Sequence, residues 1–168
     1  MASSPKLPFD PISEAHRHWL EHGWTQAAGG MAALTSIMRV QQILLGRVES
    51  QLRRFDLTFA RYELLTLLSF SRTGSLPLGK IGVRLQVHAA SVTNAVNRLE
   101  AEGLVTRVPH PDDGRVTLAQ LTPKGRRLAA KATKVLNETV FGDLGLPPDE
   151  TEQLFGLLAA IRRHEGDF

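Results

Sequence analysis

The residues best suited to chemistry in this sequence lie between positions 88 and 98. Ser91, Thr93 and Asn94 are followed by Arg98, so short hydroxyl and amide groups and one guanidinium succeed one another along a predicted helix. Most solvated helix faces carry Glu and Lys instead, because these residues cost little in helix propensity, whereas Ser, Thr and Asn are weaker helix formers. Such groups suit hydrogen bonding to phosphates and base edges. The stretch therefore indicates recognition through hydrogen bonds.

The sequence offers little for covalent or metal chemistry. It has no cysteine, no G-x-S-x-G element, no phosphate-binding loop and no clustered carboxylate pair. His18 and His22 stand four apart on one predicted helical face, with His16, Glu14 and Glu21 nearby, which raises a metal hypothesis. Because there is no H-E-x-x-H order and no thiolate, ordinary surface histidines are the favoured interpretation. We expect no enzyme, no metal site and no cofactor.

Two short helices and a hairpin are predicted to position the hydrogen-bonding face. An apolar stripe marks a helix over residues 78–85, and a second helix follows after a short turn. The stripe residues are Leu78, Ile81 and Leu85 in the first helix and Val92, Val96 and Leu99 in the second. Gly103 ends the second helix, residues 104–108 predict a strand, residues 111–114 a turn, and residues 116–121 the returning strand. A helix-turn-helix followed by a basic hairpin is typical of a winged-helix DNA reader.

Three motifs follow one another in this stretch: S-V-T-N-A-V-N-R-L-E-A-E-G-L-V-T-R, then P-D-D-G-R, then L-T-P-K-G-R. In this order they resemble the MarR family of transcription regulators. The family's wing signature, Asp-x-Arg followed by Leu-Thr-x-x-Gly, falls on Asp113, Arg115, Leu121, Thr122 and Gly125. Gly114 stands at the wing tip, where relatives often carry a second Arg, so we expect this wing to make one contact fewer.

Nine residues are predicted to bind DNA: His88, Ala89, Ala90, Ser91, Thr93, Asn94, Arg98, Asp113 and Arg115. Asn94 and Arg98 are the best candidates for base edges, because amide and guanidinium groups pair bidentately with adenine and guanine. His88 is expected to donate to a phosphate, while Ala89 and Ala90 either touch thymine methyls or permit close approach.

The wing pair Asp113 and Arg115 takes its role from the resemblance. Arg115 is expected to enter the minor groove, and Asp113, which pairs with it in the family, is expected to fix its direction. A structural clasp within the hairpin is the alternative for this pair, and the two roles are compatible.

The resemblance also implies a regulatory ligand. In the family, small aromatic or phenolic compounds often bind where the dimer helices meet the reader, and a ligand that favours a DNA-incompetent spacing shifts the population toward it. The expected ligand contacts here are Trp19, Trp24, Met38, Arg39, Gln42, Tyr62 and His88. Aromatic and Met side chains at helical spacing are also typical of plain core. A regulator that binds DNA without sensing any ligand stays an open alternative.

The sequence predicts one MarR-type domain, mainly α with a small β-wing, in four parts. Residues 1–25 are an extension with a short helix, residues 26–57 the first dimerisation helix, residues 58–124 the winged helix-turn-helix, and residues 125–168 the C-terminal dimerisation helices. The long helix and the last two carry more apolar surface than one protomer covers, so we expect a homodimer. Its two readers would lie about 34–36 Å apart on a pseudo-palindromic operator. Repression is the family's commoner mode.

Positive charge is concentrated in residues 72–134. That window holds eleven Lys and Arg against four acidic residues, a net charge of +7, whereas the rest of the chain carries −4. Such segregation indicates a DNA-binding face on an acidic scaffold. A winged helix used only for protein contacts is the alternative, and it would favour an acidic or apolar face. Since no apolar run approaches the roughly 20 residues that cross a bilayer, we expect a cytoplasmic protein that binds double-stranded DNA and no membrane.

Overall fold

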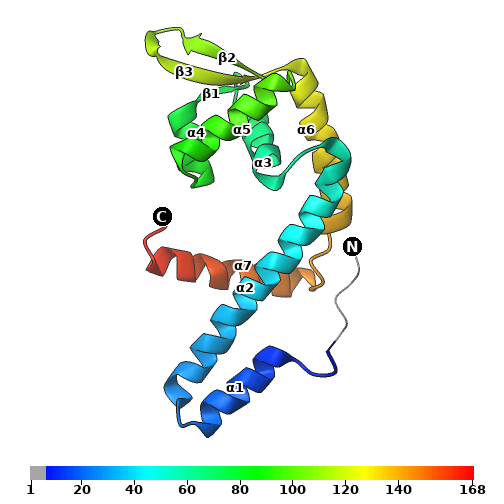
Figure 1. The fold of residues 1–168 in the computed structure, drawn as a ribbon, viewed down its shortest axis with the longest axis vertical. Coiled ribbons are helices and arrows are strands. Elements are labelled where there is room, and N and C mark those ends of the chain that lie inside the picture. Colours follow the sequence, from blue (N-terminus) through cyan, green and yellow to red (C-terminus); the bar gives the residue numbers. More distant parts are fainter. Residues whose placement is uncertain (1–6) are drawn as a thin grey trace. The chain divides into compact units, whose positions relative to one another are not determined.

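The computed structural model describes residues 7–168, so the first six residues of the predicted N-terminal extension lie outside the described residues. The chain divides into two compact units, Met1–Arg47 and Val48–Phe168. Figure 1 shows the helices and strands along the chain. Among the residues that the structure describes, no helix is both long and apolar enough to span a membrane.

The first unit begins with helix α1 (Pro11–Glu21), the short helix predicted within residues 1–25. Asp10 is its N-cap, and the Asp10 carboxylate accepts hydrogen bonds from the backbone N–H groups of Ile12 and Ser13. Pro11 at the first helical position fits this cap, because its missing N–H is not needed there. The hydrogen bond from the Ser13 hydroxyl is the main cause that lowers the pKa of Asp10.

Helix α2 (Thr25–Leu52) runs for 28 residues without a break, Gly29 and Gly30 included. Many of its large apolar side chains are exposed to solvent. The exposed ones are Leu34, Ile37, Met38, Val40 and Ile43. By contrast, Val48 and Leu52 at the C-terminal end of α2 are buried in the core of the second unit.

The second unit is a winged helix built around α3 (Phe59–Phe70). Thr58 caps α3, and α3 packs against α4 (Leu78–Leu85), α5 (Ala89–Ala101) and α6 (Pro123–Leu136). The two helices of the helix-turn-helix begin and end where the sequence predicted. Phe70, the last residue of α3, is 80% exposed, unlike the buried Leu64, Leu65 and Leu68 of the same helix.

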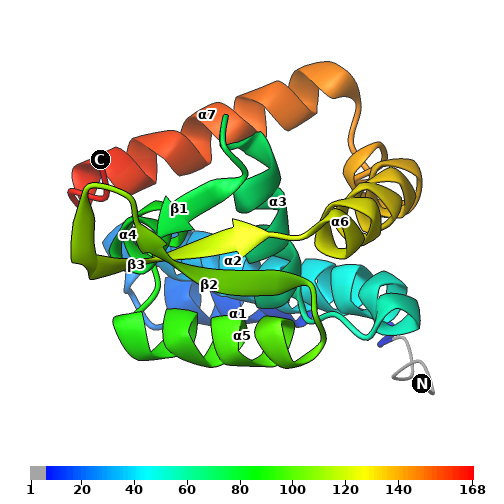
Figure 2. The same cartoon turned by 90° about the horizontal axis from the view of Figure 1, so that it is seen from above.

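An antiparallel sheet of β1 (Ser75–Pro77), β2 (Val105–His110) and β3 (Asp113–Leu121) forms the wing, with β3 in the middle. Figure 2 shows β3 between its two neighbours. Leu76 pairs with Ala119, and Val105 pairs with Leu121. The predicted turn over residues 111–114 is too long, because strand pairing continues to Asp113 opposite His110, with a bulge after Pro109.

The chain then enters α6, for which Thr122 is the N-cap and Pro123 the first residue. A π-helical turn (Asn137–Phe141) extends α6, and α7 (Pro148–His164) follows. Helix α7 has no buried residue. Its large apolar side chains Phe155, Leu157 and Ile161 are 67%, 66% and 49% exposed.

Candidate nucleic-acid interface

The outer face of α5 presents the polar residues singled out in the sequence. Val92, Val96 and Leu99 are almost fully buried, which fixes the helix on the core. Ser91, Thr93, Asn94 and Arg98 are all exposed on the remaining surface. The Thr93 hydroxyl donates to the backbone carbonyl of Ala89 at 3.0 Å, so its proton is already used and it faces a ligand mainly as an acceptor.

The N-terminal end of α5 is open to an acceptor from outside. His88 is the N-cap, but its side chain makes no capping hydrogen bond. His88, Ala89 and Ala90 are all exposed, and the two alanines add little bulk. The first N–H groups of a helix have no partner within the helix and carry partial positive charge. This end of α5 therefore suits a phosphate group.

A set of hydrogen bonds that joins α5 to the wing was not predicted from the sequence. The guanidinium of Arg107, on β2, pairs with the carboxylate of Glu100 and also donates to the Asn97 amide oxygen at 2.6 Å. The backbone N–H of Arg107 donates to the same carboxylate at 3.0 Å. Asn97, which lies on the polar face, thus holds β2 against α5 rather than standing free. The only sequence signal was the nearness of one acid, one amide and one cation around the Gly103 turn.

At the wing tip, Asp113 contacts Arg115 through the backbone. The Asp113 carboxylate accepts from the Arg115 backbone N–H at 3.0 Å, which fixes the hairpin locally. No ion pair joins the two side chains in the described part of the chain. This backbone hydrogen bond is the kind of contact that a structural clasp within the hairpin would make. The Arg115 guanidinium is exposed.

On α4, α5 and the wing, four cationic side chains have no internal partner among the described residues. Lys80, Arg84, Arg98 and Arg115 are exposed, and none of their side chains makes a hydrogen bond or ion pair there. In contrast, Arg61 on α3 is paired with Glu102 at 2.7 Å and donates to the Asp56 carbonyl at 2.6 Å. The cations on the helix-turn-helix and wing surface are thus available to attract a polyanion.

The residues predicted to bind a ligand fall in both units. Of these, Trp19 and Trp24 meet edge to face with ring centroids 5.2 Å apart, and Arg39 donates to Gln42 at 3.3 Å. Met38 is exposed on α2. These five lie in the first unit.

The other two predicted ligand contacts lie in the second unit. Tyr62 is buried on α3, and its hydroxyl is 3.0 Å from that of Thr133 on α6. It also lines a cavity of about 290 Å³. His88 is exposed on the reader.

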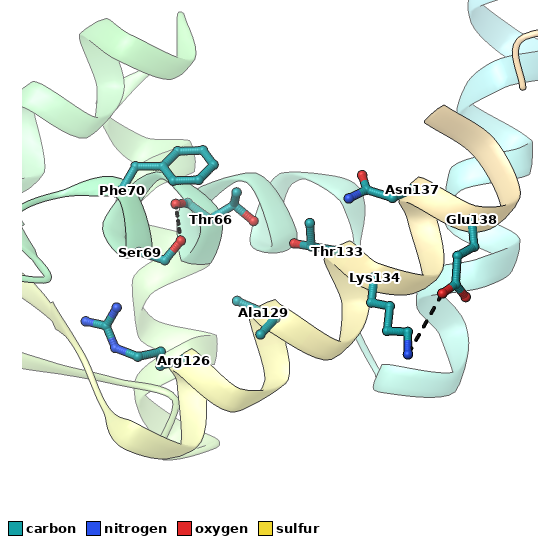
Figure 3. A pocket seen from close by; sticks show the side chains of 10 residues that line it. Thr66, Ser69, Phe70, Arg126, Ala129, Thr133, Lys134, Asn137 and Glu138 are labelled. Atoms are coloured by element: carbon teal, nitrogen blue, oxygen red, sulfur yellow. Dashed lines mark hydrogen bonds and ion pairs between the residues drawn. The ribbon is translucent and has the colours of Figure 1, made fainter. Parts of the chain in front are cut away.

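A second cavity, of about 680 Å³, lies between α3 and α6. Figure 3 shows its hydroxyl groups, Thr66 and Ser69 from α3 and Thr133 from α6. The Ser69 hydroxyl donates to the Thr66 carbonyl, and Lys134 pairs with Glu138 at 3.9 Å. The lining of this cavity therefore carries charges of both signs, and two of them, Lys134 and Glu138, pair with each other.

Of the three neighbouring histidines, His18 lies beside two carboxylates. The imidazole of His18 lies 3.3 Å from the Glu14 carboxylate and 3.2 Å from that of Glu21. Within residues 7–168, no group of three or more His, Asp or Glu side chains is arranged to hold a metal ion.

Comparison with known proteins agrees with this geometry. The sequence profile of the MarR family matches residues 57–117. The chain is 49% identical to Sco5413, a MarR family transcriptional regulator from Streptomyces coelicolor, over 83% of this chain and 97% of that one, with a TM-score of 0.76. It shares the fold of a mutant MarR from E. coli complexed with operator DNA, at 24% identity and a TM-score of 0.70, over 76% of this chain and 91% of that one.

The chain is also similar to TtmR, an HTH-type transcriptional regulator from Methylorubrum extorquens. The two are 36% identical over 113 residues, which is 67% of this chain and 56% of TtmR. The chain spans just over half the length of TtmR and of a second regulator, from Bacillus subtilis. Since the match to Sco5413 covers nearly all of that protein, the chain belongs to the MarR family, whose members are DNA-binding transcriptional regulators and not enzymes.

Proposed function

We propose that the protein binds a specific pseudo-palindromic operator in double-stranded DNA as a homodimer and represses transcription there. The observation that carries this proposal is the exposed polar face of α5, flanked by cations on α4 and the wing whose side chains have no partner among the described residues. A winged helix that serves only protein contacts has no need for such a face. Operator binding would take place in the cytoplasm.

Each proposed DNA contact has a distinct role. Asn94 and Arg98 read base edges, Ser91 and Thr93 contact bases or the flanking backbone, and the N-terminal end of α5 at His88, Ala89 and Ala90 holds a phosphate. Arg115 enters the minor groove from the wing, where Asp113 holds the hairpin backbone in place.

The homodimer would be formed by residues 26–57 and 125–168, the two regions predicted to dimerise. Support comes from α2 and α7, because each of these helices exposes several large apolar side chains rather than a single one. Two symmetric readers would then contact successive major grooves about one helical turn apart. Residues 58–124 act as the reader, and residues 1–25 as an extension of the dimer region.

We further propose that a small aromatic ligand releases the operator. The proposed contacts are Trp19, Trp24, Met38, Arg39, Gln42, Tyr62 and His88, of which Tyr62 lines a cavity within the second unit. The ligand would act through a higher affinity for the DNA-incompetent state of the dimer. A regulator that binds its operator constitutively differs only in lacking this response.

The test is binding of purified protein to labelled DNA from its own upstream region, across a salt series. The Asn94→Ala, Arg115→Ala double variant is measured beside the wild type. We expect a sequence-specific wild-type complex whose affinity falls steeply with salt. The variant should bind the specific DNA at least about a hundredfold more weakly, because each bidentate contact between a side chain and a base is worth about 1–3 kcal/mol.

The matched control removes one amide and one guanidinium elsewhere, through Gln153→Ala and Arg163→Ala on α7. This control should bind like the wild type. If wild type and double variant bind equally and weakly to every sequence, the proposed operator function is wrong and the winged helix serves protein contacts.

A further inference from the structure

The cavity that Tyr62 lines has a composition suited to one class of ligand. It lies along one side of α3, has a volume of about 290 Å³, and is bounded by four aromatic rings. These rings are Phe59, Tyr62, Phe70 and Phe141. Phe59 and Tyr62 are stacked, with ring centroids 6.3 Å apart and an angle of 21° between the planes. The faces of such rings carry negative partial charge and attract cations.

A single charged group, the carboxylate of Glu63, lines the cavity. It is half-buried on α3, and within the described part of the chain it makes no hydrogen bond and no ion pair. Burial alone raises the pKa of this carboxyl, with no neighbouring cation to lower it. An acidic group that is partly desolvated and unpaired favours a ligand that brings a positive charge.

A second polar atom in the lining also lacks a partner. The hydroxyl oxygen of Thr66, one turn after Glu63 on α3, is buried and makes no hydrogen bond. Thr66 lines both this cavity and the one shown in Figure 3. Buried polar atoms are nearly always hydrogen-bonded, so among the described residues this hydroxyl stands out as a second unpaired polar group beside Glu63.

The cavity lies next to the two helices of the helix-turn-helix, α4 and α5. Leu85, the last residue of α4, forms part of its wall. Glu63 also lines a smaller cavity under α5, together with Ser91 and Ala95. A ligand paired with Glu63 would therefore touch α4 directly and α5 through the same side chain, and any shift of Ser91 would alter the proposed DNA contacts.

We propose that this cavity binds a small organic cation with an apolar or aromatic body. The carboxylate of Glu63 pairs with the charge, and the rings of Phe59, Tyr62, Phe70 and Phe141 pack on the body. The proposal rests on the proposed function of a ligand-released regulator and gives its ligand a charge opposite to that of a phenolate.

The test is calorimetric binding of benzyltrimethylammonium to the full-length protein. Its neutral carbon analogue neopentylbenzene and the anion phenylacetate are measured beside it. We expect the cation to bind most tightly, and Glu63→Gln, which keeps the shape and removes the charge, to weaken it by about tenfold or more. The matched control Glu152→Gln, at an exposed acid on α7, should bind the cation like the wild type.

Operator binding is then measured with and without the cation. The cation should weaken the wild-type operator complex and leave the Glu63→Gln complex unchanged. Equal affinity for the cation and its neutral analogue, equal affinity in both Glu variants, or tighter binding of phenylacetate would overturn the proposal. Because ligand-free operator binding is measured first, failure of the cation to bind a protein that holds its operator counts against this inference and not against the proposed function.

Discussion

Gly125, the last residue of the wing signature, lies where α6 passes closest to the backbone of Leu104. A Cβ atom at this position would stand 2.1 Å from the Leu104 carbonyl oxygen and 2.9 Å from a methyl carbon of Leu121. Neither neighbour can move away freely, because Leu104 and Leu121 are both buried. We therefore expect Gly125→Ala to lower the free energy of unfolding by about 3 kcal/mol, as measured by urea denaturation.

Gly114→Ala is the matched control for that substitution. Gly114 is exposed at the wing tip, its φ is not positive, and an added Cβ meets nothing within 4 Å. Its change should stay within about 0.5 kcal/mol, as for most surface substitutions. Similar losses at Gly114 and Gly125 would show that the close approach to Leu104 is not what requires glycine.

Glu63 should make stability depend on pH. Its carboxyl has a raised pKa because burial disfavours the charged form, so the folded protein holds this proton to a higher pH than the unfolded chain does. The contribution to stability is therefore complete below the unfolded value of about 4.3 and is lost as the pH rises through the folded pKa. Glu63→Gln should stabilise the protein at pH 7, by less than about 1 kcal/mol because the group is only half-buried, and not at pH 4.

Thermal or urea unfolding of both proteins at several pH values measures this difference. Glu152→Gln, at an exposed acid, removes the same charge and serves as the reference. The same pH profile in both variants would mean that net charge, rather than the buried position of Glu63, produces the effect.

Sequence patterns located the helices well because their ends depend on local chemistry. Thr58 and Thr122 cap α3 and α6 with their own hydroxyl groups, and Pro123 follows its cap directly. The hairpin was less well predicted, since its strands extend as far as they can pair. Asp113 belongs to β3 because it lies opposite His110, which no composition of the turn could reveal.

The candidate DNA site divides in the same way. Helical periodicity was enough to place Asn94 and Arg98 on the exposed face of α5. It could not show that Asn97, on the same polar face, is tied to Arg107, because that contact depends on how β2 returns past the helix. Nor could it show that Glu63 on α3 has no partner among the described residues, because that depends on which side chains from other elements pack beside it.

Helices α3 and α6 provide a comparison of two threonine caps. The Thr122 hydroxyl oxygen accepts from Gly125 N–H at 3.0 Å and lies 2.9 and 3.1 Å from the carbonyl oxygens of Gly103 and Leu104. It thus joins α6 to the turn after α5. Among the described residues, the Thr58 hydroxyl oxygen accepts hydrogen bonds from Arg61 alone. The backbone nitrogen and the side-chain Nε of Arg61 each lie 3.4 Å from that oxygen.

We therefore expect Thr122→Ala to cost about 2 kcal/mol of unfolding free energy and Thr58→Ala about 1 kcal/mol or less. Urea denaturation of the two variants measures both values under the same conditions. Equal costs would indicate that only the capping bond matters and that the contacts to Gly103 and Leu104 add nothing.

At the scale of the whole molecule, the exposed apolar side chains of α2 and α7 are the surface that the proposed homodimer would cover. Helix α7 contributes no buried residue to the core, although Leu157 and Ile161 lie four residues apart on one face of it and Phe155 is exposed as well. Apolar surface of this kind favours contact with another protein surface. Charges placed there should break the dimer and leave the winged helix folded.

The variant Phe155→Glu, Leu157→Glu should accordingly sediment as a monomer while its far-ultraviolet circular dichroism stays close to that of the wild type. Because a monomer reads only one half-site, its operator affinity should fall by at least about a hundredfold. Gln153→Glu, on the same helix but at a polar position, is the control and should remain dimeric. A charged variant that still sediments as a dimer with full operator affinity would move the interface away from α7 and leave α2 to carry it alone.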